Sequence, residues 1–193
     1  MRYSPEHKSE ARGKILQATG RGFRRHGFGG IGVDGLAKEA GVTSGAFYGH
    51  FPSKAEAFTA AAIAGLIELR EGIEHLRQTE GDVWLDKFVD FYLSVRRTCE
   101  MGESCGLQSM TPDVIRSDNI TKRAYQAELL KVVEAMTSDL PQQHMPLSQA
   151  TAWAILAALS GGVSMARSIN DKKVSDAIAT SIKASISTLV TSS

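Results

Sequence analysis

The segment IGVDGLAKEAGVTSGAFYGHF occupies residues 31–51 and contains two short apolar stretches separated by a glycine. The first stretch predicts a helix of about two turns that Gly41 ends. The second predicts another short helix, which begins at Thr43 or Ser44 and ends near His50. Two short helices joined in this way have the proportions of a helix-turn-helix, whose second helix enters the major groove of DNA.

The apolar residues of this segment predict how its two helices pack. We expect the small core between them to consist of Leu36, Ala37, Val42, Phe47 and Phe51. The outward-facing positions are then Thr43, Ser44, Gly45, Ala46, Tyr48, Gly49 and His50. A short helix, a glycine and a second short helix also occur in many proteins that do not bind DNA, so the pattern alone is weak evidence.

Helical periodicity continues along the rest of the chain, and no segment alternates as a strand does. A first helix is expected to end in the basic turn before Gly27. The later helices are expected at about 53–78, from 82 onwards, 118–138, 148–169 and 171–190, begun by Ser53, Asp82, Asp118, Ser148 and Asp171. Ser53 and Glu56 have the spacing of a capping box. Residues 102–112 are expected to form a loop with a short helix, and 141–146 a linker. The predicted fold is all-α, with about nine helices.

Composition indicates a chain that folds without cross-links. Of its 193 residues, 42% are hydrophobic and 22% charged, which suffices for a sizeable core. Only two cysteines, Cys99 and Cys105, occur, and the N-terminus lacks the apolar run of a signal peptide, so a cytoplasmic location is expected. The uncharged stretch 145–166 is rich in small and hydroxyl residues. It predicts a closely packed helix rather than a membrane span.

Charge is distributed unevenly along the chain. Residues 1–54 carry nine Lys and Arg against four Asp and Glu, whereas the remainder carries thirteen against seventeen. A basic segment attached to a more acidic one suggests that the basic segment binds a polyanion, although an excess of this size can also arise by chance.

Residues 40–54, AGVTSGAFYGHFPSK, resemble the signature of the tetracycline-repressor (TetR/AcrR) family of bacterial transcription regulators. The resemblance covers about residues 10–58, and beyond them the likeness is architectural. It implies a three-helix DNA-binding domain at 1–53 and an effector-binding and dimerisation domain at 54–193. It also implies a homodimer that binds a near-palindromic operator, usually as a repressor that a small molecule releases.

Carried over residue by residue, the family pattern implies phosphate contacts from Thr43, Tyr48, His50 and Lys54. Hydroxyl donors and a lysine suit phosphate oxygens, and Thr43 stands at the positive end of its helix. Each residue also has a purely structural interpretation: Thr43 as an N-cap, Tyr48 as a packing aromatic, His50 as a helix-end cation and Lys54 as a solvated charge.

The chain departs from the family pattern at two points. Gly32 stands where the family usually has Ser or Thr, so the hydroxyl that would contact phosphate is missing. The base-facing positions are Ser44, Gly45, Ala46 and Gly49, none of which offers bidentate base readout. Specificity is therefore expected to depend on DNA shape or on the basic N-terminal residues Arg2, Lys8 and Arg12.

The resemblance places an effector pocket in the body of the protein. Candidate lining residues are Trp84, Phe88, Phe91, Tyr92, Met101, Cys105, Leu107, Met110, Tyr125, Met136 and Trp153. They suggest an apolar or aromatic effector, although aromatics and methionines at helical spacing are more often core residues. Cys105, between glycines and near Cys99, leaves a second possibility, a regulator that senses oxidants or electrophiles. No neighbour in sequence visibly activates either thiol.

The last two helices are expected to form the dimer interface. The small residues Ala157, Gly161 and Gly162 in one helix and Ile178, Ile182 and Ile186 in the other suit a closely packed four-helix contact between two subunits.

Other classes of protein are less consistent with the sequence. It lacks a His-Glu-x-x-His zinc motif, a Gly-x-Ser-x-Gly elbow and a phosphate-binding loop, so neither an enzyme nor a metal or cofactor site is expected. A helical interaction adaptor or a small all-α enzyme remains an alternative, but an adaptor would leave the basic N-terminal segment unexplained.

Overall fold

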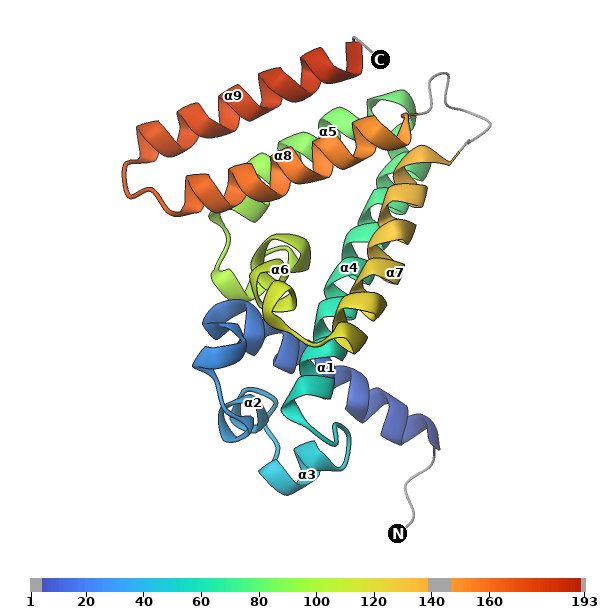
Figure 1. Ribbon diagram of the computed structural model, residues 1–193, viewed down its shortest axis with the longest axis vertical. Coiled ribbons are helices and arrows are strands. Elements are labelled where there is room, and N and C mark those ends of the chain that lie inside the picture. The colour runs from blue at the N-terminus through green and yellow to red at the C-terminus, as the bar shows by residue number, and fades with distance from the viewer. Residues whose placement is uncertain (1–4, 139–146, 192–193) are drawn as a thin grey trace. The chain divides into compact units, whose positions relative to one another are not determined.

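The computed structural model of the protein describes residues 5–138 and 147–191, with side chains from residue 9 onwards. Within these ranges every regular element is a helix, which confirms the predicted all-α fold (Figure 1). The predicted linker at 141–146 lies outside the described residues, as does Arg2.

The described chain packs into two compact units. The first contains the residues up to Gly65 together with Met101–Tyr125, and the second contains Leu66–Glu100 and the residues from Gln126 onwards. Two helices contribute residues to both units, namely α4 (Lys54–Glu80) and α7 (Asn119–Thr137).

The first unit is built from α1 (Pro5–Gly30), α2 (Val33–Glu39), α3 (Ser44–Tyr48), α6 (Gly106–Arg116) and the adjoining parts of α4 and α7. At Gly27 the backbone of α1 leaves helical geometry with a φ of 70°, which agrees with the predicted helix end. The chain resumes at Phe28, whose N–H donates to Asp113 Oδ2 at 2.7 Å. The rings of Phe23, Phe28 and Phe58 pack together there.

The prediction of a loop with a short helix at 102–112 is wrong. A 3₁₀ turn at Met101–Glu103 leads into α6, which continues through Pro112 to Arg116. The glycines that suggested a loop serve helix packing instead, since a Cβ on Gly106 would lie 2.8 Å from the Cα of Gly65 in α4. α6 persists beyond its proline because Leu107, Met110 and Val114 are buried along one face.

The second unit consists of α5 (Trp84–Phe91), α8 (Gln149–Arg167), α9 (Lys172–Thr191) and the remaining turns of α4 and α7. A 3₁₀ turn at Gly81–Val83 precedes α5, and the N-cap of α5 is Val83. The prediction that Asp82 caps α5 is therefore wrong. After Phe91 the chain continues in a π-helical turn, Tyr92–Arg96, which the sequence did not suggest.

Four predicted helix starts are confirmed by hydrogen bonds to the backbone. Ser53 Oγ accepts from Glu56 N at 3.1 Å, and Asp118 Oδ1 accepts from Thr121 N at 2.7 Å. Ser148 Oγ accepts from Thr151 N at 3.1 Å, and Asp171 Oδ1 accepts from Lys173 N at 2.7 Å. The bond from Thr121 also holds the pKa of Asp118 below its usual value of 3.8.

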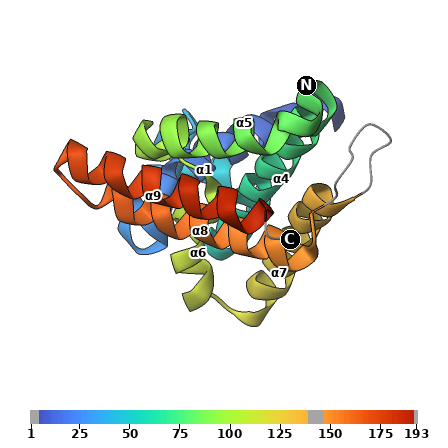
Figure 2. The ribbon, with the colours of Figure 1, turned by 90° about the horizontal axis from the view of Figure 1, so that it is seen from above.

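Helices α8 and α9 lie side by side and antiparallel (Figures 1 and 2). The helices pack closely at Gly162, where an added Cβ would lie 1.9 Å from Ile182 Cδ1. The side chain of Ile182 therefore occupies the notch that Gly162 leaves in α8.

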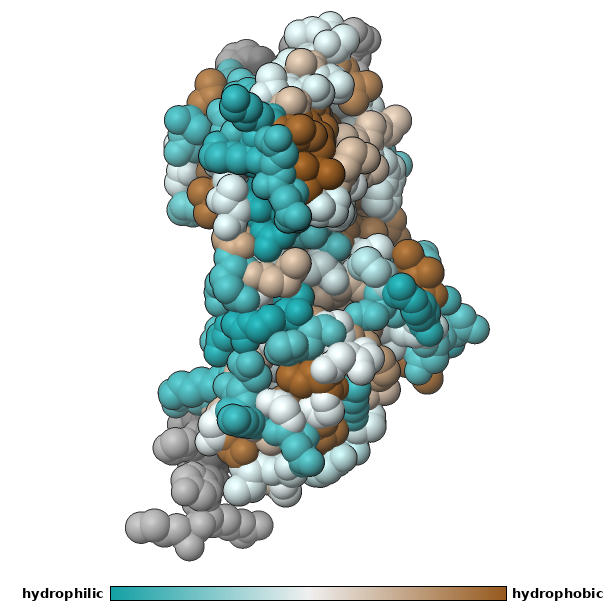
Figure 3. All heavy atoms as spheres, turned by 90° about the vertical axis from the view of Figure 1, so that its left-hand side faces the viewer, coloured by the Kyte–Doolittle hydropathy of each residue, from teal (hydrophilic) through white to brown (hydrophobic). Residues whose placement is uncertain are grey.

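The surface is mixed in character. On the face drawn in Figure 3, hydrophilic residues predominate and hydrophobic ones form separate patches. Among the described residues, no helix combines the length and the apolar character needed to span a membrane.

Candidate nucleic-acid interface

The helix-turn-helix core forms as predicted between α2 and α3. Gly41, with a φ of 67°, makes the turn that follows α2. Leu36 and Phe47 are fully buried, and Phe51 nearly so. The Phe47 and Phe51 rings lie 5.5 Å apart. Ala37 is buried as well, whereas Val42 is half-buried.

Two hydroxyl side chains stabilise the start of α3. Thr43 is its N-cap, and Thr43 Oγ1 accepts from Ala46 N at 3.2 Å. Because Thr43 accepts in this bond, its O–H hydrogen can still be donated to an external acceptor. Ser44 Oγ donates to Asp34 Oδ1 at 2.6 Å, which joins α3 to α2 and occupies the Ser44 donor.

The outer face of α3 is accessible. Thr43, Gly45, Ala46 and Gly49 are exposed, and Tyr48 is exposed to 51%. Ser44 and His50 are only half-buried rather than fully outward. His50 Nδ1 is buried and has no hydrogen-bond partner among the described residues, so Nε2 is the ring nitrogen available to a ligand.

Lys54 begins α4, directly after the Ser53 cap. Its Nζ lies 4.4 Å from the centre of the Phe28 ring, a cation–π contact that holds the ammonium group near the end of α1. Lys54 is thus partly ordered by packing rather than freely solvated.

Three arginines of the first unit differ in the partners that their side chains contact. Arg24 donates to Gly102 O at 3.4 Å and Arg25 pairs with Glu39 at 2.8 Å, so both have structural roles. Arg12 is exposed and stacks on the Phe51 ring, 4.9 Å from its centre, beside the helix-turn-helix core. Sequence reasoning did not foresee this stacking. The side chain of Lys8 is not among those that the structure describes.

The candidate effector residues fall into three groups. In the second unit Trp84, Phe88 and Tyr92 form a row with ring centres 6.5 and 5.7 Å apart, and Met136 is buried in the same unit. In the first unit the buried residues are Cys105, Leu107, Met110 and Tyr125. Phe91, Met101 and Trp153 are exposed.

Tyr125, one of the buried residues of the first unit, has a defined polar partner. Its hydroxyl lies 2.7 Å from Thr111 Oγ1. Burial raises the pKa of Tyr125 to about 12, so the phenol stays neutral at physiological pH.

The two cysteines differ in their surroundings. Cys105 is buried and is the N-cap of α6, whereas Cys99 is half-buried. Arg167 Nη1 lies 3.8 Å from Cys99 Sγ, and the same guanidinium donates to Cys99 O at 2.9 Å. A cation therefore stands beside Cys99, although none is adjacent in sequence.

The candidate dimer residues divide between two environments. Gly162 and Ile186 are buried within the chain, and Ile178 and Ile182 are half-buried. Ala157 and Gly161 are exposed on α8. The dimer itself stays a prediction.

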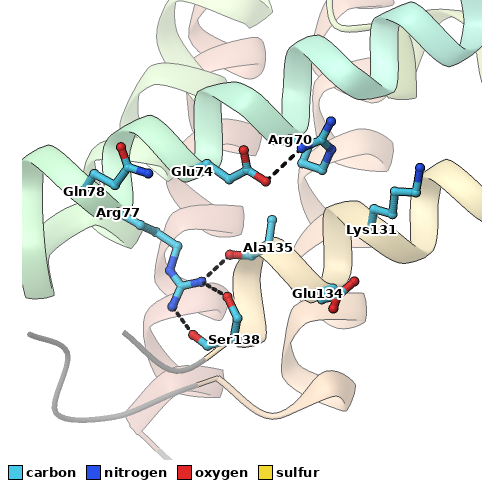
Figure 4. Close-up of a pocket in the computed structure, with 8 residues that line it drawn as sticks. All are labelled: Arg70, Glu74, Arg77, Gln78, Lys131, Glu134, Ala135 and Ser138. Atoms are coloured by element: carbon cyan, nitrogen blue, oxygen red, sulfur yellow. Dashed lines mark hydrogen bonds and ion pairs between the residues drawn. The ribbon is translucent and has the colours of Figure 1, made fainter. Parts of the chain in front are cut away.

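A cluster of charged residues between α4 and α7 in the second unit escaped sequence reasoning (Figure 4). Arg77, only 4% exposed, donates to Ala135 O, Ser138 O and Ser138 Oγ at the end of α7 and lies over the Trp84 ring. Close by, buried Glu128 accepts from Arg70 at 3.1 Å and Lys131 at 2.9 Å.

The charge state of Glu128 follows from these contacts. Burial opposes its ionisation, but the bonds from Lys131 and Arg70 hold the pKa of Glu128 below its usual value of 4.5. Arg70 and Arg77 thus link α4 to α7, whereas Lys131 pairs with Glu128 within α7.

Comparison with known proteins shows which protein family the helix-turn-helix segment resembles. Residues 15–61 match the model of a family described as bacterial regulatory proteins, tetR family. The chain is 32% identical over 83 residues to the HTH-type transcriptional regulator TtgR of Pseudomonas putida, and 37% identical over 87 residues to the probable HTH-type transcriptional regulator ArpR of the same species. These matches cover 43% and 45% of the chain, but only 39% and 40% of the two relatives.

Solved structures resemble the whole fold. A TetR-family regulator from Agrobacterium tumefaciens superposes with a TM-score of 0.73 at 16% identity, over 92% of this chain and 98% of that one. Another, from Streptomyces coelicolor, gives 0.71 at 19% identity, over 94% and 96%. Residues 15–61 therefore match the tetR family of bacterial regulatory proteins, which confirms the resemblance drawn from residues 40–54, and the chain shares its fold with solved TetR-family regulators.

Proposed function

We propose that this protein is a transcription regulator that binds an operator as a homodimer and is released from it by a small molecule. The observation that carries the proposal is the exposed outer face of α3 on a well-packed helix-turn-helix core, within the segment that matches the family. Such a face is what the second helix of the motif presents to the major groove.

Phosphate contacts would come from the two ends of α3. Thr43 retains an O–H donor after capping the helix, and the positive end of the helix favours an anion there. At the other end stand the exposed Tyr48 hydroxyl, His50 Nε2 and the Lys54 ammonium, which Phe28 holds in place. These four groups position the protein without reading sequence.

Base readout would depend little on α3 side chains. The Ser44 donor already serves Asp34, and Gly45, Ala46 and Gly49 carry no polar side-chain atom. Ala46 can contact a thymine methyl group, and the glycines permit close approach to the DNA. Arg12, ordered by Phe51, is well suited to a minor groove whose width depends on sequence.

Dimerisation would use the outer face of α8 and α9. The exposed large apolar residues of the two helices are Trp153, Met165, Val174 and Leu189, and Ile169 is exposed in the connection between them. Between Trp153 and Met165 lie the exposed small residues Ala157 and Gly161, which allow a second helix to approach closely. An isologous contact on this face would give the two-fold symmetry that a palindromic operator requires.

An apolar or aromatic effector remains part of the proposal. The row formed by Trp84, Phe88 and Tyr92 contains a tilted and an edge-to-face ring contact, and a ligand bound there should quench tryptophan fluorescence. Release of DNA over the same concentration range would link the two events.

A mobility-shift titration with the DNA upstream of its own gene tests DNA binding. Lys54→Met keeps an unbranched apolar side chain to pack on Phe28 but removes the charge. It should weaken binding and lower the salt dependence of log K by about one unit per half-site. Lys87→Met, an exposed lysine of α5, is the matched control and should leave both unchanged. Equal salt slopes for Lys54→Met and wild type would contradict the assigned contact.

Sedimentation tests the dimer. The wild type should sediment as a dimer, and Gly161→Trp should shift it toward monomer and weaken DNA binding in parallel. A stable monomer that still binds the complete operator would contradict the proposed interface.

A further inference from the structure

A cavity lies within the first unit. It has a volume of about 530 Å³ and lies among the end of α1, the start of α4, the end of α6 and the start of α7. Its lining residues are Phe28, Gly29, Ala55, Phe58, Asp113, Arg116, Ser117, Asp118 and Thr121. This volume is in the range of ordinary small-molecule sites.

The walls combine an aromatic surface with acidic groups. The Phe28 and Phe58 rings meet edge to face, with centres 5.2 Å apart; Phe58 is only 2% exposed, so half-buried Phe28 offers most of the ring surface available to an apolar ligand. Two large apolar residues, Ile115 and Ile120, are exposed to 66% and 70% and flank the lining residues 116–118 in sequence. Exposed apolar side chains thus adjoin the lining residues along the chain.

The lining contains two carboxylates, of Asp113 and Asp118, against one cation, Arg116; the Lys54 ammonium group, which is not among the lining residues, lies 4.4 Å from the centre of the Phe28 ring. The side chain of Asp113 is only 21% exposed, whereas that of Arg116 is 71% exposed and lies 3.8 Å from Asp113. Arg116 also donates to Pro112 O. Because a charge interacts more strongly where water is excluded, the carboxylate of Asp113 should outweigh the solvated Arg116. Asp118, at the start of α7, adds a second negative charge.

Asp113 also connects this cavity to α1. Its Oδ2 accepts the N–H of Phe28, the residue that follows the break at Gly27. A ligand that donates to Asp113 competes for this carboxylate, and a ligand ring against Phe28 contacts the same turn. The turn continues directly into α2 and the helix-turn-helix.

We propose that this cavity binds a small aromatic cation, with its ring on Phe28 and Phe58 and its ammonium group on Asp113, and that its occupation weakens DNA binding. The second part rests on the proposed function, whereas the first part does not.

Calorimetry on the full chain tests the binding. The probe is 2-naphthylmethylamine, and its control is 2-naphthylacetate, which has the same ring and the opposite charge. We expect the wild type to bind the amine at least about tenfold more tightly than the acetate, and Asp113→Asn to lose about tenfold in amine affinity. Asn keeps an oxygen that can accept from Phe28. Asp86→Asn, an exposed acid of α5, should bind as the wild type does.

A second variant tests the position of the site. Ala55→Phe fills the cavity from α4 without touching any charge, and it should abolish amine binding. Equal affinity for amine and acetate, or amine binding that neither Asp113→Asn nor Ala55→Phe reduces, would overturn the proposal.

The effect on DNA is measured separately, with the DNA upstream of the gene. The amine should weaken DNA binding by the wild type and not by Ala55→Phe. If the amine binds through Asp113 but DNA affinity does not change, the regulatory part is wrong. If the amine binds in this way and the protein does not bind the DNA at all, the cavity stands and the proposed function fails.

Discussion

The adjacent glycines of α8, Gly161 and Gly162, should respond to the same substitution with opposite signs. Alanine stabilises a helix interior by about 1 kcal/mol relative to glycine. At Gly161 no described atom lies within 4 Å of the new Cβ, so Gly161→Ala should gain this amount. At Gly162 the new Cβ would lie 1.9 Å from Ile182 Cδ1 and 3.0 Å from Cγ1, so α9 or the Ile182 side chain must move.

Overpacking of this kind costs roughly 1–3 kcal/mol. Subtracting the helix-propensity gain leaves Gly162→Ala destabilised by about 1 kcal/mol. The two single variants should therefore differ by about 2 kcal/mol, or roughly 4–8 °C in melting temperature for a chain of this size. Urea denaturation at fixed protein concentration gives the free energies, since a dimer would make them concentration-dependent.

A double-mutant cycle identifies the clashing atom. Ile182→Val removes Cδ1 and keeps the rest of the side chain, so it should cost about 1 kcal/mol in the wild type but little in Gly162→Ala. If Gly161→Ala and Gly162→Ala change stability equally, the notch between α8 and α9 does not exist as described.

Three further outcomes follow from the charged and thiol groups. Arg77→Met should lower the free energy of unfolding by about 3 kcal/mol or more, because carbonyls at the end of α7 lose their donors. The substitution Lys122→Met, at an exposed position of α7, should leave the stability unchanged. Equal melting temperatures for the two variants would contradict this expectation. Because the folded-state pKa of Glu128 is lowered, its stabilisation is present above pH 4.5 and is lost as pH falls through the lowered pKa, so Glu128→Gln should flatten the stability profile below pH 4.5. Iodoacetamide should alkylate half-buried Cys99 well before buried Cys105, as peptide mass spectrometry can measure, and the reverse order would favour Cys105 as a sensor.

The features that sequence predicted well are local ones. The caps at Ser53, Asp118, Ser148 and Asp171 bond to backbone N–H groups two or three residues away, so the pattern contains both partners. The core of α2 and α3 was predictable for the same reason, because its members are close in sequence.

The features that sequence missed depend on distant partners. Gly106 begins a helix rather than a loop because Gly65 of another helix lies against it. Arg77 is buried because α7 ends beside it, and Cys99 has a cation beside it because Arg167 reaches across from α8. Spacing along the chain contains no information about such pairs. The cavity beside Phe28 escaped prediction in the same way, since four helices contribute to it.

The notch at Gly162 bears on the order in which this protein assembles. Contacts between neighbouring helices close short loops and form early in folding. Since Ile182 sets the register of α9 on α8 within a single chain, this hairpin needs no second copy to acquire its shape. A second subunit would then bind α8 and α9 when they are already folded. Association should therefore follow ordinary bimolecular kinetics between folded monomers, with no refolding step.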